Sequence, residues 1–273
     1  MSVRGYVQAT HAGPTLAVTT FTVALALSVG LGWRAPLAAA AVLTGQLSVG
    51  WANDYLDRHV DHEADRQDKP LVRGEVSDRG LLLGLVLALV LTVPLSLLLG
   101  WWAGLAQLAG VACGLAYDAG VKRTPASPLP YLVAFALVPT SFVVLALPAG
   151  STPRASVVVA SGLLGASAHF TNAIKDLEAD ARTGVRGLPQ RLGARWSGVV
   201  SGVLLLVGSS LLLAGAELPA LATTVASLAG IVALGYVLLV LVGRRVRHAF
   251  ALNVLAVGLL VAAVVASGSQ VVV

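Results

Sequence analysis

The sequence has few charged residues and an excess of apolar ones. Only 11% of its 273 residues are Asp, Glu, Lys or Arg, 57% are hydrophobic, and the mean hydropathy is +0.85. Soluble domains carry about 25% charged residues, because a polar surface must cover their core. The composition therefore excludes a water-soluble globular protein, and most of the surface must face lipid.

Cysteine and targeting signals are scarce as well. The single Cys113 lies in the apolar run 110–116, which excludes a disulfide within the chain and favours a small buried side chain. Residues 1–13 lack the pattern of a cleavable signal peptide. The excess of Ala, Val, Leu, Gly and Arg is typical of a high-GC bacterial genome. We therefore expect a single domain over residues 1–273 in a bacterial cell membrane.

Nine apolar runs are long enough to cross a bilayer, which requires about 20 residues per helix. They cover residues 14–32, 35–52, 80–100, 101–116, 129–149, 155–171, 197–214, 218–242 and 249–266. Each run is expected to be helical, because a helix satisfies its own backbone hydrogen bonds in lipid. The sequence thus predicts an all-α integral membrane protein with nine transmembrane helices in a bundle.

The basic residues lie almost entirely on one side of these runs. Of the 18 Lys and Arg residues, 16 fall at the N-terminus or in the loops after even-numbered runs, and the exceptions are Arg34 and Arg154. Because cytoplasmic loops carry an excess of Lys and Arg, we expect the N-terminus and these loops in the cytoplasm. Twelve of the thirteen acidic residues lie on the same side, so they need another explanation.

The acidic residues concentrate in two copies of the motif Asn-x₃-Asp-x₃-Asp. One copy ends the second run and the other ends the sixth, within expected loops at about 53–79 and 172–196. Each copy follows the second helix of a four-helix unit. We therefore predict a duplicated four-helix unit plus one further helix, with the two motifs converging between the units. The motif residues are Asn53, Asp57, Asp61, Asn172, Asp176 and Asp180.

A spacing of four residues places the polar side chains of each motif on one face of a helix. Carboxylates at this spacing repel one another unless a cation binds between them. Mg²⁺ accepts carboxylate oxygens from a protein and phosphate oxygens from a substrate. The sequence therefore predicts a site for Mg²⁺ and a diphosphate. The neighbouring basic residues that suit the phosphates are Arg66, Lys69, Arg73, Arg182 and Arg186.

Several segments then share a pattern with one family of enzymes. They are Asn53-Asp54-x-x-Asp57-x-x-x-Asp61, Lys175-Asp176-x-x-x-Asp180, Asp68-Lys69-Pro70-Leu71, Tyr117 with Lys122-Arg123, and Gly184-Val185-Arg186-Gly187-Leu188-Pro189. In these segments and in its nine runs the chain resembles the UbiA superfamily of intramembrane prenyltransferases. The resemblance implies that Mg²⁺ assists ionisation of a prenyl diphosphate, whose prenyl group passes to an aromatic or other lipophilic acceptor.

The same resemblance implies roles for individual residues. The acidic side chains expected to take part in catalysis are Asp54, Asp57, Asp61, Asp176 and Asp180. The side chains expected to bind the substrate are Arg66, Lys69, Tyr117, Lys122, Arg123, Lys175 and Arg182. The asparagines and the other motif carboxylates are expected to ligate Mg²⁺. The oligomeric state, the prenyl chain length and the identity of the acceptor stay open.

Two positions depart from the family pattern, and both concern the acceptor. Family members commonly have Tyr-Ser where this chain has Tyr117-Asp118, and many have Arg-Pro near the start of the first run, where this chain has residues 11–14, His-Ala-Gly-Pro. The residues that suit the task of orienting or deprotonating an acceptor are His11, His59, His62 and Glu63. The long polar loops at 53–79 and 172–196 favour transfer to an acceptor over cyclisation.

Other functions fit the sequence less well. A UbiA-type terpene cyclase, or an enzyme that transfers a phosphoribosyl group to a polyprenyl phosphate, would need the same metal-bound diphosphate, so the aspartates do not separate these reactions. A cation transporter would need charged residues at the midplane of its spans, which these runs lack. Nucleic-acid binding has no support, because the basic residues are scattered over membrane-proximal loops.

Overall fold

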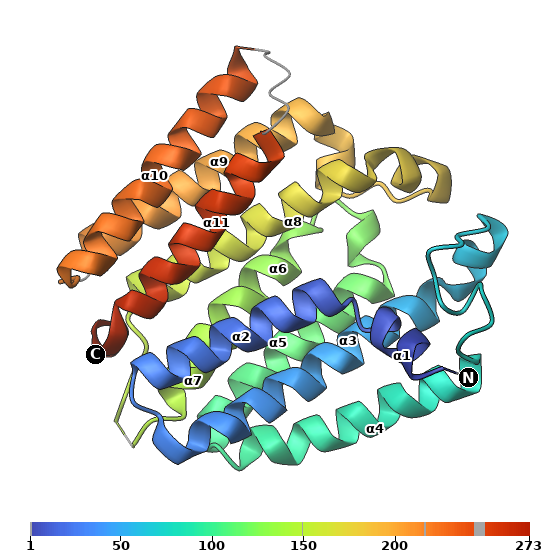
Figure 1. Cartoon of the computed structure of the whole chain (residues 1–273), viewed down its shortest axis with the longest axis horizontal. Helices are drawn as coiled ribbons and strands as arrows, with labels where there is room; N and C mark the ends of the chain where they lie inside the picture. Colours follow the sequence, from blue (N-terminus) through green and yellow to red (C-terminus); the bar gives the residue numbers. More distant parts are fainter. Residues whose placement is uncertain (1, 149, 216, 243–248) are drawn as a thin grey trace.

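The computed structural model describes residues 2–148, 150–215, 217–242 and 249–273. Apart from one bridge between Pro153 and Val272, the described regular elements are helices. They are α1 (Val3–Ala9), α2 (Ala12–Ser28), η1 (Gly32–Arg34), α3 (Ala35–Glu63), α4 (Asp78–Leu97), α5 (Trp101–Ala119), η2 (Val121–Arg123), α6 (Pro128–Phe135), η3 (Ala136–Ser141), α7 (Phe142–Leu145), α8 (Ala155–Thr183), α9 (Leu188–Gly215), α10 (Ala220–Leu241), α11 (Ala249–Ala266) and η4 (Gly268–Val271). The predicted all-α class is confirmed (Figure 1).

The long helices pack into one bundle. In the first half α3 packs on α2, α4 and α5, and in the second half α9 packs on α8 and α10. One hydrophobic cluster joins the halves, with Leu25 and Phe142 from the first and Leu205 and Leu260 from the second. Many outward side chains are apolar too, including Leu83 at 60% exposure and Ile231 at 65%. An apolar outer surface is expected for a protein whose solvent is lipid.

Six helical segments in the described part of the chain are long and apolar enough to cross a membrane. They are Gly32–Glu63, Asp78–Leu97, Pro128–Leu145, Ala155–Glu178, Leu188–Gly215 and Ala220–Leu241. Each of the other three expected runs coincides with a helix, α2, α5 or α11, that does not meet these limits of length and hydropathy. The protein is therefore a multi-pass membrane protein, and the count of nine spans stays a prediction.

The two arginines that depart from the charge asymmetry have structural partners. Arg34 precedes α3 and donates to the carbonyl oxygens of Leu99, at 2.7 Å, and of Ala146. Arg154 precedes α8 and donates to the carbonyl of Gln270 at 2.8 Å. Both guanidinium groups therefore satisfy backbone carbonyls where helices end, which explains two cations at the end of the bundle opposite the motifs.

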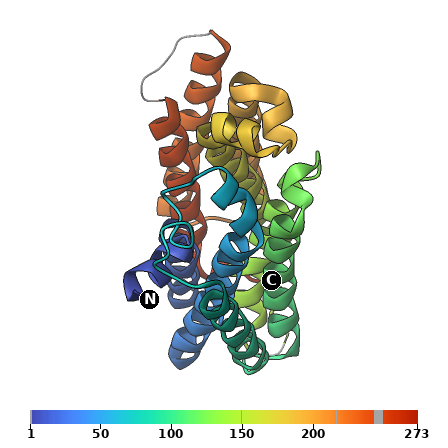
Figure 2. The ribbon, with the colours of Figure 1, turned by 90° about the vertical axis from the view of Figure 1, so that its right-hand side faces the viewer.

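The two motif helices are longer than the apolar runs that precede them. Both α3 and α8 have 29 residues, and the motifs lie in their last turns. The expected loops at 53–79 and 172–196 therefore begin too early, because both helices continue past the apolar runs, to Glu63 and Thr183. α8 stops at Gly184, whose backbone adopts a left-handed conformation with φ 73°. Both helix ends lie on the same side of the molecule (Figures 1 and 2).

The connections after these helices differ in length. After α3 the chain runs through residues 64–77 before α4 begins, whereas only residues 184–187 separate α8 from α9. The second expected loop is thus mostly helical, and α9 contains a break at Gly193, where φ is 74°. The long second loop that favoured an acceptor-using enzyme is not present in this described region.

Candidate active site

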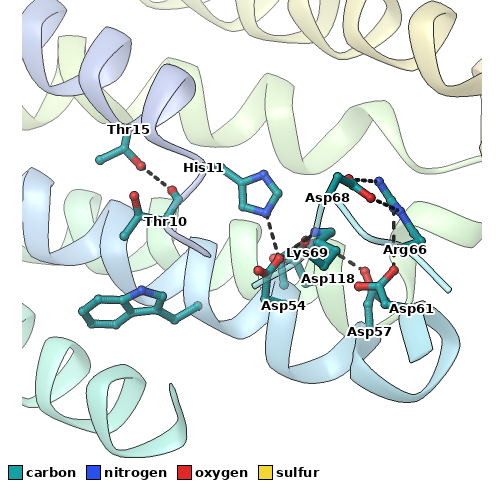
Figure 3. Close-up of polar contacts among 12 residues, drawn as sticks. Thr10, His11, Thr15, Asp54, Asp57, Asp61, Arg66, Asp68, Lys69 and Asp118 are labelled. Atoms are coloured by element: carbon teal, nitrogen blue, oxygen red, sulfur yellow. Dashed lines mark hydrogen bonds and ion pairs between the residues drawn. The ribbon is translucent and has the colours of Figure 1, made fainter. Parts of the chain in front are cut away.

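The first motif lies on α3 against basic residues from two other segments. Lys122, from the turn after α5, pairs with Asp57, and Arg123 lies 4.0 Å from the same carboxylate. Arg66, from the connection after α3, lies 3.6 Å from Asp61. Figure 3 shows Asp57 and Asp61 near the end of the helix, with Arg66 beside Asp61. The structure therefore brings Arg66, Lys122 and Arg123 to the first motif, as the sequence predicts.

Asp54 points to a different set of partners. Its carboxylate is 2% exposed and accepts a bond from Lys69 at 2.6 Å, while His11 Nε2 lies 3.1 Å from the same oxygen. Lys69 also reaches Asn53 Oδ1 at 3.5 Å. Asp54 therefore positions basic side chains from the N-terminal segment and from residues 64–77 (Figure 3).

Asp118 belongs to this site, although the sequence marked it only as a departure from the family pattern. Asn53 Nδ2 donates to Asp118 Oδ1 at 2.7 Å, and Lys122 lies 3.9 Å from the same carboxylate. Asp118 is 6% exposed. By holding the amide nitrogen, Asp118 leaves Asn53 Oδ1 directed toward Lys69, so it orients the first residue of the motif.

The second motif is more open. Asn172 and Asp176 are exposed, and Lys175 donates to Asn172 at 3.4 Å. Asp180 accepts a bond from Gln190 Nε2 at 2.6 Å. Gln190 lies on α9 and was missed in the sequence, because nothing near residue 190 signals a contact with a carboxylate ten positions earlier. The side chain of Arg182 lies outside the described residues.

Electrostatic interactions connect the two motifs. Burial lowers the pKa of Arg66, but its hydrogen bond to Asp68 and the charges of Asp68, Asp61 and Asp176 together raise that pKa above its usual value. Burial raises the pKa of Asp180; the hydrogen bond from Gln190 opposes this shift and the charge of Asp176 adds to it. Arg66 thus lies within electrostatic range of an aspartate of each motif.

An aromatic cluster lies beside the two motifs. Tyr117 is within electrostatic range of Asp57 and Asp180, one from each motif. Its ring packs edge-on against Tyr131 at 5.1 Å and His169 at 5.6 Å between centroids. His169 Nε2 lies 3.1 Å from Ser127 Oγ, which also accepts a bond from the backbone of Leu188. This cluster joins α5, α6 and α8 beneath the motifs.

Two of the predicted acceptor-side histidines lie outside this network. His59 and His62 are exposed, and the ring of His62 bonds the carbonyl of Arg58 on its own helix at 2.7 Å. Glu63 is exposed as well. His11 differs from them, because it contacts a buried carboxylate.

The donor chemistry of the motifs fits Mg²⁺, although the carboxylates are not gathered in advance. The described residues contain no group of three or more His, Cys, Asp or Glu side chains placed to hold a metal ion. Mg²⁺ commonly takes only one or two protein carboxylates and completes its shell with water and substrate phosphates. The present arrangement therefore suits a metal site that assembles together with the diphosphate.

Two hollows lie on the surface of the bundle. An apolar groove of about 530 Å³ lies between α2 and α11, with Leu16 and Phe21 on one side and Val261 on the other. A second hollow of about 360 Å³ lies beside the second motif, between Leu177 on α8 and Arg186 and Arg191 beyond it. The first provides an apolar surface for a chain of hydrocarbon, and the second combines apolar and cationic groups.

The model of the UbiA prenyltransferase family matches residues 14–257. The chain belongs to this family. Over 166 residues it is 36% identical to the bacteriochlorophyll synthase 33 kDa chain of Cereibacter sphaeroides. The matched segment covers 56% of this chain and 53% of that protein. Over 202 residues it is 32% identical to the digeranylgeranylglyceryl phosphate synthase of Natronomonas pharaonis. That matched segment covers 71% of each of the two proteins.

Solved UbiA structures share the fold. A UbiA homolog from Archaeoglobus fulgidus bound to GPP and Mg²⁺ superposes with a TM-score of 0.72 at 19% identity, covering 97% of this chain and 99% of that one. The UbiA homolog from Aeropyrum pernix K1 gives 0.66 at 23% identity. The match to the Cereibacter protein spans about half of that protein's length.

Proposed function

We propose that this UbiA-family protein is a Mg²⁺-dependent intramembrane prenyltransferase, which ionises a prenyl diphosphate and transfers the prenyl group to an aromatic or other lipophilic acceptor. The observation that carries the proposal is the pairing of two carboxylate motifs with cations at one end of the bundle. Arg66 lies beside Asp61 and interacts with Asp176, so a diphosphate between the motifs would meet both signs of charge. The names of the curated relatives support a synthase of this class.

The basic residues would bind the departing diphosphate. Arg66, Lys122 and Arg123 contact carboxylates in this structure, and they would be available to the phosphates when the motif oxygens bind Mg²⁺. Lys175 and Arg182 would serve the second motif, and Tyr117 would line the space between the two. Lys69, which the sequence predicts to bind the substrate, contacts Asp54 in this structure and would hold the first motif in place. These cations stabilise the negative charge that develops on the leaving oxygen.

Mg²⁺ bound by Asn53, Asp57, Asp61, Asn172, Asp176 and Asp180 would add Lewis-acid stabilisation of the same charge. The apolar bundle beneath the site would keep water from the allylic cation. The apolar groove between α2 and α11 would face the bilayer, and it suits the hydrocarbon part of a substrate. A lipid substrate therefore explains why the site lies in a membrane protein.

We further propose that all nine apolar runs cross a bacterial cell membrane and that the motifs face the cytoplasm. The exposed Trp33, Trp101 and Trp102 lie at the starts of their helices, at the end of the bundle opposite the motifs. Indole rings prefer the interface, so these residues support one bilayer boundary there. The charge asymmetry of the sequence supports the cytoplasmic assignment of the other end.

The test is product analysis with purified protein in lipid nanodiscs. Geranyl, farnesyl and geranylgeranyl diphosphate are supplied with Mg²⁺, with and without a panel of aromatic and aliphatic acceptors, and the products are identified by mass. Prenylated acceptor that disappears on addition of EDTA is the expected result. A cyclic hydrocarbon formed without acceptor would instead establish the cyclase reaction. Product only from phosphoribosyl diphosphate and a polyprenyl phosphate would establish phosphoribosyl transfer.

A further inference from the structure

His11 has an unusual backbone conformation. Its φ is 53° and its ψ is 61°, in the left-handed region that side chains with a Cβ rarely adopt. Among the described residues only Asp65 shares a positive φ without being glycine. His11 precedes α2, yet its side chain makes no capping bond to that helix. The strained conformation therefore does not serve helix capping, and such strain often persists where a side chain is needed in one place.

The strained backbone directs the ring to a buried carboxylate. Nε2 lies 3.1 Å from Asp54 Oδ1, and the side chains are 44% and 2% exposed. Lys69 forms an ion pair with the same oxygen at 2.6 Å. Because an ionised carboxylate only accepts hydrogen bonds, Nε2 is the nitrogen that donates to it, and in the neutral ring Nδ1 then carries the lone pair. No described group bonds Nδ1, so the half-exposed ring offers one basic nitrogen (Figure 3).

The N-terminal segment packs against α3, and this contact holds the His11 ring in one position. Trp51 Nε1 donates to the carbonyl of Tyr6 at 3.1 Å, and Thr15 Oγ1 donates to the carbonyl of Thr10 at 2.8 Å. A Cβ on Gly50 would lie 2.6 Å from Thr10 O, so the segment approaches α3 as closely as a glycine allows. His11 is held from both sides by ordered backbone.

The ring also lies near the donor site and near a route from the bilayer. It is within electrostatic range of Asp118, which binds Asn53 of the first motif. Leu16, at one end of the groove between α2 and α11, follows His11 by about one turn of α2. The charged groups that face the ring are Asp54, Lys69 and Asp118. An acceptor in the groove could therefore present its polar end to the ring.

We propose that His11 is the general base for a neutral lipophilic hydroxyl acceptor, a phenol or an alcohol, and that Asp54 is its positioning residue. The inference rests on the proposed prenyl transfer. The allylic C–O bond of the donor breaks and its electron pair leaves with the diphosphate. An oxygen lone pair of the acceptor forms the new C–O bond, the O–H electron pair stays on that oxygen, and the proton passes to Nδ1 of His11. A carboxylate that holds the far nitrogen of an imidazole fixes its tautomer for this task.

A purely structural role for His11 predicts different behaviour. If the ring only braced the N-terminal segment on α3, its loss would impair every reaction of the enzyme equally. A base acts only while the acceptor still has a proton to lose. The ionisation state of the acceptor therefore separates the two roles, and it can be changed with little change in acceptor shape.

The experiment compares naphthol and nitronaphthol as acceptors of geranyl diphosphate, with Mg²⁺ at about pH 8, in the unaltered protein and three variants. Naphthol keeps its proton there, since phenolic groups titrate near pH ~10, whereas the nitro group makes nitronaphthol an anion. His11→Gly removes the ring and suits the left-handed backbone. His11→Gln keeps a hydrogen-bond donor for Asp54 but no basic nitrogen. Asp65→Gly is the matched control, because it relieves the other left-handed residue without touching the site.

The expected result is that both His11 variants form the naphthyl ether about 100-fold more slowly and the nitronaphthyl ether at the unaltered rate. Asp65→Gly should match the unaltered protein with both acceptors. Unchanged naphthyl ether formation in His11→Gly, or an equal loss with both acceptors, would overturn the assignment of the base while leaving the transferase intact. No ether from either acceptor in the unaltered protein would overturn the transfer to hydroxyl acceptors, and the role of His11 with it.

Discussion

Asp54 and the two aspartates of the first motif each contact a basic residue that comes from another segment of the chain. Asp54 has Lys69, Asp57 has Lys122, and Asp61 has Arg66. A charge that leaves water without a partner costs several kcal/mol, so these pairs are needed while no metal neutralises the carboxylates. The pairs differ in burial, and their contributions to stability should therefore differ.

Lys69→Met should destabilise the fold by about 3–5 kcal/mol, because it leaves Asp54 buried without its cation. The lysine side chain is 10% exposed and the carboxylate 2%. Arg58→Met is the control. Its partner Asp78 is 58% exposed, and the loss should be below about 1 kcal/mol. Thermal unfolding in detergent measures both, and equal stability of the two variants would contradict the assigned burial.

Asp176→Asn should lower turnover by about 100-fold or more while the melting temperature stays unchanged. A metal contact stabilises a transition state by several kcal/mol, and each 1.4 kcal/mol is tenfold in rate. Asp176 is exposed, so its replacement leaves no buried group without a partner. Glu178→Gln, also exposed and two residues further along α8, should retain full activity. Full turnover in Asp176→Asn would show that the second motif does not share the metal.

At the scale of elements, glycines let helices and segments approach each other closely. Gly165 on α8 faces Phe135, and a Cβ there would lie 2.5 Å from that ring. Buried hydroxyl and amide groups join α9 to α8 and α11: Ser201 on α9 bonds Ser167 on α8 at 2.8 Å and Asn253 on α11 at 2.7 Å. Small residues and short polar bonds are the usual means of helix association in lipid, where apolar burial contributes little.

Gly50→Ala should destabilise the protein by about 1–3 kcal/mol, because overpacked atoms force the backbone to move. Its Cβ would lie within 2.8 Å of three backbone atoms of Thr10, which no rotamer change can relieve. Gly235→Ala on α10 is the matched control, since nothing lies within 4 Å of its Cβ. That change should be neutral or stabilising by about 0.5–1 kcal/mol. Identical melting curves for both variants would argue against the close contact of the N-terminal segment with α3.

At the scale of the whole molecule, the prediction concerns orientation. With Cys113 replaced by Ala, a cysteine at exposed Gln67 should react with a membrane-impermeant reagent only after the cytoplasmic face is opened. A cysteine at exposed Thr152 should react in intact cells, because it lies at the other end of the bundle, beside Arg154. The reverse pattern would show that the charge asymmetry misleads about topology.

The sequence alone determined the solvent, the helical class and the two motifs. Apolar runs and their loop charges are local in sequence, and lipid permits little besides helices, so these features are readable without a structure. The positions of Asn53, Asp57 and Asp61 on one helical face also follow from spacing alone. The apolar runs predict ends for α3 and α8 that come too early. The bilayer thickness sets the length of the apolar run, but the helix continues beyond the run into the polar region.

Tertiary structure alone decided which residues meet. His11 contacts a carboxylate 43 positions away, and Asp118 orients an asparagine 65 positions away. Gln190 reaches Asp180 only because the connection between α8 and α9 is as short as residues 184–187. Each contact depends on how helices distant in sequence pack together, and no local pattern records that packing. The sequence therefore names the charged residues of the site, and the fold decides which of them bind substrate and which position another residue.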